Sequence, residues 1–148
     1  MSTIKVFLDS SALIAGVISS IGAARVLLVM SENGQIEAYI SEQVIEESER
    51  SIARKAPHAL SDLRQTLKDA NPKIVPDPSK KEIAENLYLI KDRDDVAILL
   101  AAMKSKVDFL ATHNRKHFLE DSKVAEKSGL RIGTPGDALA WIRENLGA

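Results

Sequence analysis

Short runs of apolar, β-favouring residues alternate along the chain with longer segments whose apolar positions recur at helical spacing. The first pattern is typical of buried strands and the second of helices with one buried face. The apolar runs predict strands at residues 4–8, 36–40, 73–75, 108–112 and 131–133. The helical pattern covers residues 12–18, 22–30, 42–55, 59–70, 80–89 and 94–105, and a last helix opens at 134–135. Strands that alternate with helices indicate an α/β fold with a mostly parallel sheet and helices on both faces.

Polar residues at the predicted boundaries support this division. Ser41 stands where an N-cap is expected, and Ser10 and Ser11 are the candidate caps of the first helix. Thr134 followed by Pro135 is a cap residue with proline at the first helical position. No repeat, low-complexity tract or linker interrupts the pattern, so we expect a single domain over residues 1–148.

Acidic and amide residues follow the predicted strands where parallel sheets bind their ligands. Such sheets bind ligands at the carboxyl ends of the strands, near the point where the strand order reverses. Asp9 ends the first strand, and Asn114 stands two residues beyond the strand that ends at Thr112. We expect these side chains to share one rim of the sheet with acidic residues that the helices carry. The helical candidates are Glu46, Glu47, Asp92, Asp94 and Asp95.

Each of these carboxylates also has a simpler explanation. Asp9 can cap a turn, Glu46 and Glu47 can lie on a solvated helix face, and acidic residues at a helix start complement its dipole. The apolar run 96–103 has to pack on the sheet, however, and this carries Asp95 inward. Three converging carboxylates suit a hard cation such as Mg²⁺ or Mn²⁺. The matching chemistry is metal-assisted hydrolysis of a phosphodiester.

Composition and the absence of certain motifs exclude several other classes of protein. The 148 residues include no cysteine, which excludes disulfides, thiol nucleophiles and iron–sulfur clusters. The 20 Lys and Arg against 21 Asp and Glu give a net charge of −1, which argues against a general polyanion binder. No phosphate-binding loop, dinucleotide fingerprint or nucleophile elbow is present. His113 and His117 lack the partners of a zinc site and are expected to be polar loop residues. Without a long apolar run or a signal peptide, we expect a cytoplasmic protein that makes no membrane contact.

Four segments together resemble the PIN-domain nucleases. The similar segments are residues 7–13 (FLDSSAL), 40–47 (ISEQVIEE), 91–102 (KDRDDVAILLAA) and 109–118 (FLATHNRKHF), and the resemblance runs from residue 4 to about 139. It implies a three-layer α/β/α sandwich around a mostly parallel central sheet, with a metal-dependent ribonuclease site. In that site Asp9, Glu47 and Asp95 would hold Mg²⁺ or Mn²⁺ and carry the catalysis.

The resemblance also implies partners and further site residues. Many bacterial and archaeal members of this size are VapC-like toxins, which a small antitoxin neutralises and which are often dimeric. Asp94 and Asn114 are further candidate metal ligands, although Asn114 stands where many members carry Asp and brings no charge. Ser10 and Thr112 are candidate supporting residues.

Basic residues next to the predicted site indicate how RNA is held. Arg115 and Lys116 flank the site and are candidates to hold phosphates, which position RNA without reading its sequence. The basic residues between Arg50 and Lys68 are expected to lie on solvated helix faces. The sequence thus favours a Mg²⁺- or Mn²⁺-dependent ribonuclease and toxin, with RNA, an antitoxin and a second copy of the chain as partners. Two alternatives stay open: a non-catalytic PIN-like module that binds RNA or protein, and an aspartyl-phosphate enzyme that uses Asp9.

Overall fold

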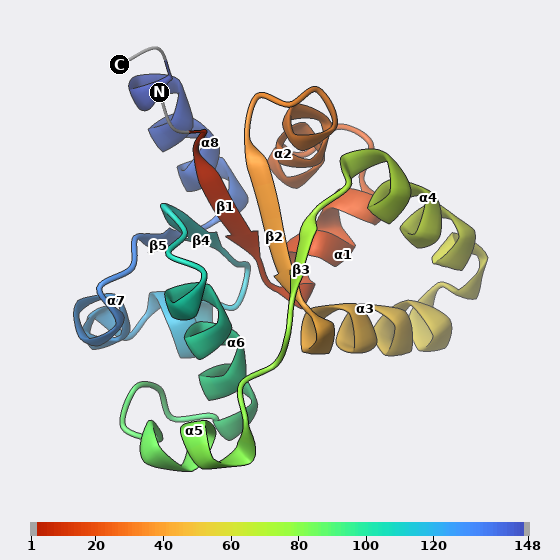
Figure 1. The fold of residues 1–148 in the computed structure, drawn as a ribbon. Coiled ribbons are helices and arrows are strands. Elements are labelled where there is room, and N and C mark those ends of the chain that lie inside the picture. The colour runs from red at the N-terminus through yellow and green to blue at the C-terminus, as the bar shows by residue number, and fades with distance from the viewer. Residues whose placement is uncertain (1–2, 147–148) are drawn as a thin grey trace.

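The five predicted strands form one parallel sheet. The computed structural model describes residues 3–146 (Figure 1). Phe7 of the first strand aligns with Tyr39 of the second and Leu110 of the fourth, and all neighbouring strands run parallel. The predicted α/β fold with a parallel central sheet is therefore confirmed. The strands are β1 (Lys5–Leu8), β2 (Glu37–Ser41), β3 (Lys73–Val75), β4 (Phe109–Ala111) and β5 (Ile132–Gly133), in the order β3-β2-β1-β4-β5.

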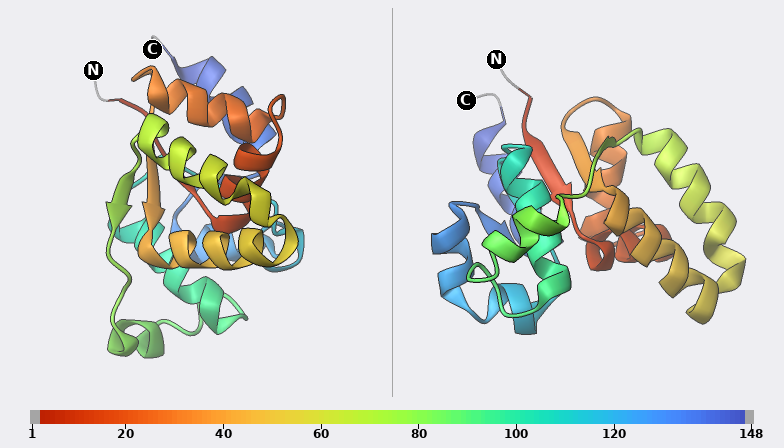
Figure 2. Two further views of the ribbon diagram at one scale, coloured as in Figure 1. Left: turned by 90° about the vertical axis from the view of Figure 1, so that its right-hand side faces the viewer. Right: turned by 60° about the horizontal axis from the view of Figure 1, so that its bottom comes forward.

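Helices cover both faces of this sheet and make three layers. They are α1 (Ser10–Ile18), α2 (Ala23–Glu32), α3 (Glu42–Lys55), α4 (Leu60–Ala70), α5 (Lys80–Glu85), α6 (Arg93–Lys104), α7 (Ser122–Ser128) and α8 (Pro135–Asn145), with short helical turns at Pro57–Ala59 and Arg115–Leu119. α1, α2 and α8 lie on one face and α6 lies on the other (Figures 1 and 2). Because parallel crossovers are right-handed, the reversal of direction after β3 sends α6 to the face opposite α1 and α2. α3 and α4 form a hairpin in which α4 packs on α1 and α2.

Helix starts follow the predicted caps with one difference. Ser41 and Thr134 cap α3 and α8 as predicted. The N-cap of α1, however, is Asp9, whose side chain accepts a hydrogen bond from Ala12 N. The two serines that were the predicted caps lie in the first turn instead. A carboxylate suits this position because it satisfies a free backbone N–H and complements the helix dipole.

Two other segments differ from the predicted elements. The helix predicted over residues 80–89 ends at Glu85, because Asn86 is its C-cap and donates a side-chain hydrogen bond to the carbonyl oxygen of Glu82. The chain after β4 contains a π-helical turn and α7, which the sequence pattern did not predict. Both are too short to show a clear periodicity, and Phe118 and Val124 bury their apolar sides.

The core lies between the sheet and the helices on each face. Phe7 of β1, Leu110 of β4 and Leu99 of α6 are fully buried, and α6 is buried at every residue from 96 to 102. The apolar run of α6 therefore packs on the sheet as predicted, which brings the acidic start of this helix to the carboxyl ends of the strands. Within residues 3–146 no single helix is long and apolar enough to cross a membrane, and only the bent pair of α1 and α2 passes that test together.

Candidate metal centre

The carboxyl ends of β1 and β4 lie at the point where the strand order reverses. β1 pairs with β2 on one side and with β4 on the other. Asp9 follows β1 directly and Thr112 follows β4 directly, so their side chains meet between neighbouring strands. Parallel sheets bind ligands at this kind of position.

Three hydrogen-bond donors hold the Asp9 carboxylate. Its Oδ1 accepts from the Ser11 hydroxyl at 2.6 Å and from Ala12 N at 2.9 Å, and its Oδ2 accepts from the Thr112 hydroxyl. Thr112 Oγ1 in turn accepts from Asn114 N at 2.9 Å. Asp9 is only 4% exposed, and burial raises the pKa of its carboxyl against the lowering effect of these hydrogen bonds. Oδ2 keeps a lone pair for a further partner, because each carboxylate oxygen accepts two hydrogen bonds.

A cavity of about 420 Å³ opens at these strand ends. α3 carries Glu47 to its wall, whereas the neighbouring Glu46 is exposed to solvent, so only one of the two predicted glutamates is placed at the site. The start of α6 contributes Asp94 and Asp95. The other predicted residues that line the cavity are Asp9, Ser10, Asp92 and Asn114.

Glu47 carries the least satisfied oxygen at this site. Its Oε1 is buried and has no hydrogen-bond partner within residues 3–146. Burial raises the pKa of the Glu47 carboxyl first, and the negative charges of Asp94, Asp95 and Asp9 raise it further. A hydrogen bond from Gln43 lowers the pKa of this carboxyl only in part, so a partly buried carboxylate among like charges is a local source of instability that a cation would relieve.

Asp95 forms a hydrogen bond with a histidine that the sequence pattern places in a loop. His117 Nδ1 lies 2.6 Å from Asp95 Oδ2 and 4.0 Å from Asp92 Oδ2. Asn114 Oδ1 accepts from His117 N at 3.2 Å, which fixes the start of the π-helical turn that carries this ring. Burial raises the pKa of Asp95 to about 6, although the hydrogen bond from His117 lowers it. The spacing of His113 and His117 was visible in the sequence, but only the π-helical turn directs His117 toward Asp95.

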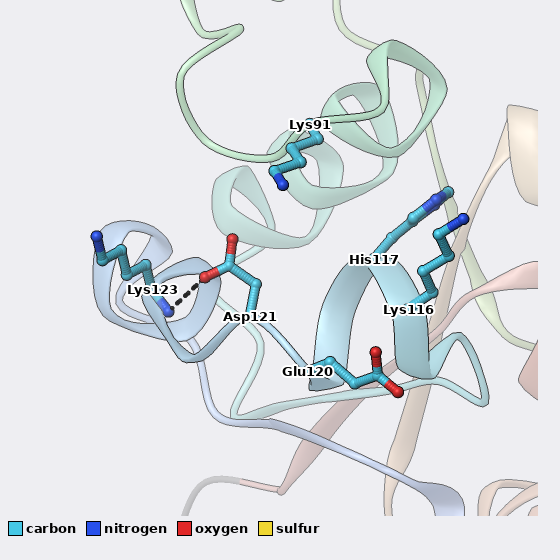
Figure 3. Close-up of a pocket in the computed structure, with 6 residues that line it drawn as sticks. All are labelled: Lys91, Lys116, His117, Glu120, Asp121 and Lys123. Atoms are coloured by element: carbon cyan, nitrogen blue, oxygen red, sulfur yellow. Dashed lines mark hydrogen bonds between the residues drawn. The ribbon is translucent and has the colours of Figure 1, made fainter.

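Of the supporting and RNA-binding candidates, some line the acidic cavity and others lie on the exposed surface beside it. Ser10 lines the cavity, but Ser11 makes the hydrogen bonds to Asp9 and also accepts from His113 N at 2.9 Å. Arg115 and Lys116 are both exposed. Lys116 lines a second hollow of about 500 Å³, together with Lys91, Lys123, Glu120 and Asp121 (Figure 3). His117 belongs to both hollows, so this lysine-lined surface adjoins the acidic cavity.

The donor set at the cavity fits a divalent cation. Asp9, Glu47 and Asp95 offer carboxylate oxygens, and Glu47 Oε1 is the buried oxygen that has no other partner in the described chain. Within residues 3–146, the side chains whose ligand atoms all lie within 4.8 Å of one another are Asp92, Asp95 and His117. Of the predicted metal ligands, this cluster contains only Asp95. Oxygen-rich sites suit Mg²⁺ and Mn²⁺, and an imidazole nitrogen suits Mn²⁺ better than Mg²⁺.

Comparison with protein families identifies the family of this chain. Residues 5–116 match the sequence profile described as the PIN domain, which is most of the chain. The chain belongs to the PIN domain family. PIN domains are in general nucleases that use divalent metals. The matched range contains the predicted carboxylates and Asn114, and it ends within the π-helical turn. No protein with a curated description matches the sequence.

Three solved structures share this PIN fold at low sequence identity. One is VapBC2 from Rickettsia felis bound to a DNA fragment from its promoter, with 17% identity, a TM-score of 0.63, and 88% of this chain and 98% of that chain covered. PAE2754 from Pyrobaculum aerophilum has 18% identity and a TM-score of 0.65, and the match covers 96% and 91% of the two chains. A domain of a functionally unknown protein from Methanocaldococcus jannaschii has 21% identity and a TM-score of 0.52, and the match covers 89% and 91%. These similarities confirm the three-layer architecture.

Proposed function

We propose that this PIN domain is a Mg²⁺- or Mn²⁺-dependent ribonuclease that hydrolyses RNA phosphodiester bonds. The observation that carries the proposal is that Asp9, Glu47 and Asp95 line one cavity, where Glu47 presents a buried oxygen that has no hydrogen-bond partner within residues 3–146. Family membership supports the same conclusion. Asp94 and Asn114 line the same wall and are the further candidate ligands.

The chain's own residues prepare the site in two ways. Ser11, Thr112 and the start of α1 hold Asp9 in one orientation, so this carboxylate needs no rearrangement to bind a cation. His117 orients the Asp95 carboxylate by a hydrogen bond, as residues next to a metal site commonly orient the metal ligands. A bound divalent metal would supply Lewis acidity, which lowers the pKa of water and neutralises charge on the phosphoryl oxygens.

We propose further that the protein acts as the toxin of a toxin–antitoxin pair. Membership of the PIN family and the fold shared with the Rickettsia felis VapBC2 complex support this role. The proposal includes a small antitoxin as partner, a homodimer and a cytoplasmic location. Expression of the chain alone should slow growth, and Asp95→Asn should relieve the effect. Normal growth with abundant folded wild-type protein would contradict a toxin role.

Cleavage of RNA by the purified protein tests the nuclease proposal. We expect cleavage with Mg²⁺ or Mn²⁺, loss of cleavage with EDTA, and a decrease of about a hundredfold or more in Asp9→Asn, because one metal ligand loses its charge. Asparagine is as good an N-cap as aspartate, but its amide nitrogen replaces one of the two oxygens that accept hydrogen bonds, so circular dichroism has to show that the variant is folded. Asp62→Asn, on an exposed position of α4, is the matched control and should cleave normally.

The same experiment separates the two alternatives. A non-catalytic PIN module binds RNA without any metal-dependent cleavage. An aspartyl-phosphate enzyme accumulates phosphate on the protein, and this phosphate is lost in Asp9→Asn. Cleavage that survives both EDTA and Asp9→Asn would refute the metal mechanism. The structure gives no observation that favours either alternative, and the hydrogen bonds on both Asp9 oxygens weaken it as a nucleophile.

A further inference from the structure

A groove of about 540 Å³ runs from the acidic cavity along α3. α1 contributes Ser10, Ser11 and Ile14 to its walls, and the C-terminal half of α3 contributes Arg50, Arg54 and Lys55. The groove and the acidic cavity share Ser10, Ser11 and Glu47, so the two hollows adjoin each other. Figure 1 shows α3 leading away from the carboxyl ends of the strands, with α1 beside it.

The cations of this groove are open to solvent. Arg50, Arg54 and Lys55 are exposed, and none of them forms a salt bridge within residues 3–146. By contrast, Lys73 and Lys104 each pair with a glutamate. The one acidic side chain of the groove is Glu47, at its inner end beside the candidate metal centre.

Helix stability accounts for these three residues only in part, although Arg50 stands four positions after Glu46 at a favourable spacing for an ion pair. Arg54 and Lys55 lie in the last turn of α3, where a cation complements the helix dipole, but Arg50 lies before that turn. Arg50 and Arg54 are also four positions apart on the same helix face, and two like charges at that spacing destabilise a helix. An anion in the groove would remove this repulsion.

We infer that this groove binds the sugar–phosphate backbone of one arm of a single-stranded RNA substrate, leading out from the cleavage site. The inference rests on the proposed function and names the path of its substrate. Arginine donates to phosphate oxygens in a planar fork, and the hydroxyls of Ser10 and Ser51 suit contacts to sugar and phosphate. No aromatic side chain lines the groove, so it holds the backbone without stacking on bases.

The length of the groove matches the number of its cations. From Glu47 to Lys55 the helix rises about 12 Å, at 1.5 Å per residue. That length accommodates about three successive phosphates of one extended single strand. The hollow in Figure 3 is less suited to a polyanion, because Glu120 and Asp121 lie among its lysines.

Binding without cleavage tests the inference. A short fluorescein-labelled oligouridylate is titrated with protein in EDTA, and its anisotropy is measured over a range of NaCl concentrations. We expect the triple variant R50S/R54S/K55S to bind RNA about tenfold more weakly at low salt. The slope of log K against log salt concentration should flatten by about 2, because each of the lost phosphate contacts contributes about 0.7 to it. The charge-retaining variant R50K/R54K should keep the wild-type slope.

The matched control removes the same charges elsewhere. R64S/K68S/R143S replaces two arginines and a lysine at exposed helical positions that do not line the groove, and it should bind RNA like the wild type. Circular dichroism compares the folding of the two triple variants. If R50S/R54S/K55S unfolds, the single variant R50S replaces it, and the slope should then change by about 0.7.

Three results would overturn the inference. They are equal weakening by the two triple variants, absence of RNA binding by the wild type, and tighter binding of polyglutamate than of RNA through the same three residues. The last result would assign the groove to an acidic protein segment. A wild type that binds RNA through the groove but never cleaves it would instead refute the proposed nuclease and leave the groove assignment standing.

Discussion

The two halves of the candidate metal centre are built in opposite ways. The strand-borne half, Asp9 with Ser11 and Thr112, is buried, and each carboxylate oxygen accepts at least one hydrogen bond. The helix-borne half, Glu47 and Asp95, depends on side chains from separate elements, and within the described chain Glu47 Oε1 has no partner.

The fold alone is enough to order the strand-borne half of the site. Backbone pairing of β1 with β4 places Asp9 against Thr112 before any ligand binds. Glu47 and Asp95 are brought close by helices that pack on the core for other reasons, and their like charges repel. We therefore expect substitutions in the strand-borne half to cost stability, and substitutions in the helix-borne half to change the response to pH and metal.

Thr112→Val should give the largest change in stability. The variant removes the hydroxyl that donates to Asp9 and accepts from Asn114 N, and it leaves both groups without this partner. We expect the free energy of unfolding to fall by about 3 kcal/mol in urea denaturation. Ser48→Ala is the matched control, because the buried Ser48 hydroxyl has no partner in the described chain and its removal should be neutral or stabilising. Equal losses in the two variants would contradict the proposed rigidity of the strand-borne half.

The metal-free protein should lose stability relative to Asp95→Asn as the pH rises. Asp95 has a pKa raised from 3.8 to about 6 by burial, so the folded protein holds this proton more tightly than the unfolded chain. The stability from the protonated carboxyl is present below 3.8 and is lost as the pH rises through about 6. We expect the wild type to lose about 2 kcal/mol relative to the variant between these limits.

Urea denaturation in EDTA at several pH values measures this difference, and saturating Mn²⁺ should abolish much of it by neutralising the carboxylate. A difference between wild type and variant that stays constant with pH would refute the raised pKa.

Glu47→Gln should stabilise the metal-free protein while weakening metal binding. The change removes an unfavourable charge but keeps the shape of the side chain. Because Glu47 is partly exposed, we expect a gain of about 1 kcal/mol rather than several. Glu46→Gln changes the adjacent, exposed residue and should alter neither property. Thermal melting with EDTA and with Mn²⁺ measures both effects. If Mn²⁺ raises the melting temperature of Glu47→Gln as much as that of the wild type, this residue does not belong to the metal centre.

Asn114→Asp should give the smallest effect, a modestly larger rise in melting temperature with Mn²⁺. A carboxylate keeps the hydrogen bond from His117 N and adds charge to the cavity wall. In EDTA the added repulsion should lower the melting temperature slightly. Asn33→Asp, at the exposed C-cap of α2, controls for added charge alone. An unchanged Mn²⁺ response would assign Asn114 to capping the π-helical turn only.

The basic residues of α3 show where sequence reasoning was limited. The run from Arg50 to Lys68 was expected to be solvated, and Arg64 and Lys68 are indeed exposed on α4. Arg50, Arg54 and Lys55 are equally exposed but line a groove that adjoins the acidic cavity. Charge and spacing along one helix are the same in both cases, and only the packing of α1 beside α3 distinguishes them.

Apart from the π-helical turn and α7, the sequence predicts the strands and helices along the chain, the parallel sheet and the strand-end position of Asp9. These follow from local patterns, because the apolar period and the residues at each boundary act over a few neighbouring positions. Tertiary structure alone decided that Ser11 rather than Ser10 supports Asp9, that Glu47 faces the cavity while Glu46 does not, and that His117 pairs with Asp95. Each of these depends on the rotation of a helix or turn against another element, and a rotation of that kind is fixed by side chains distant in the sequence.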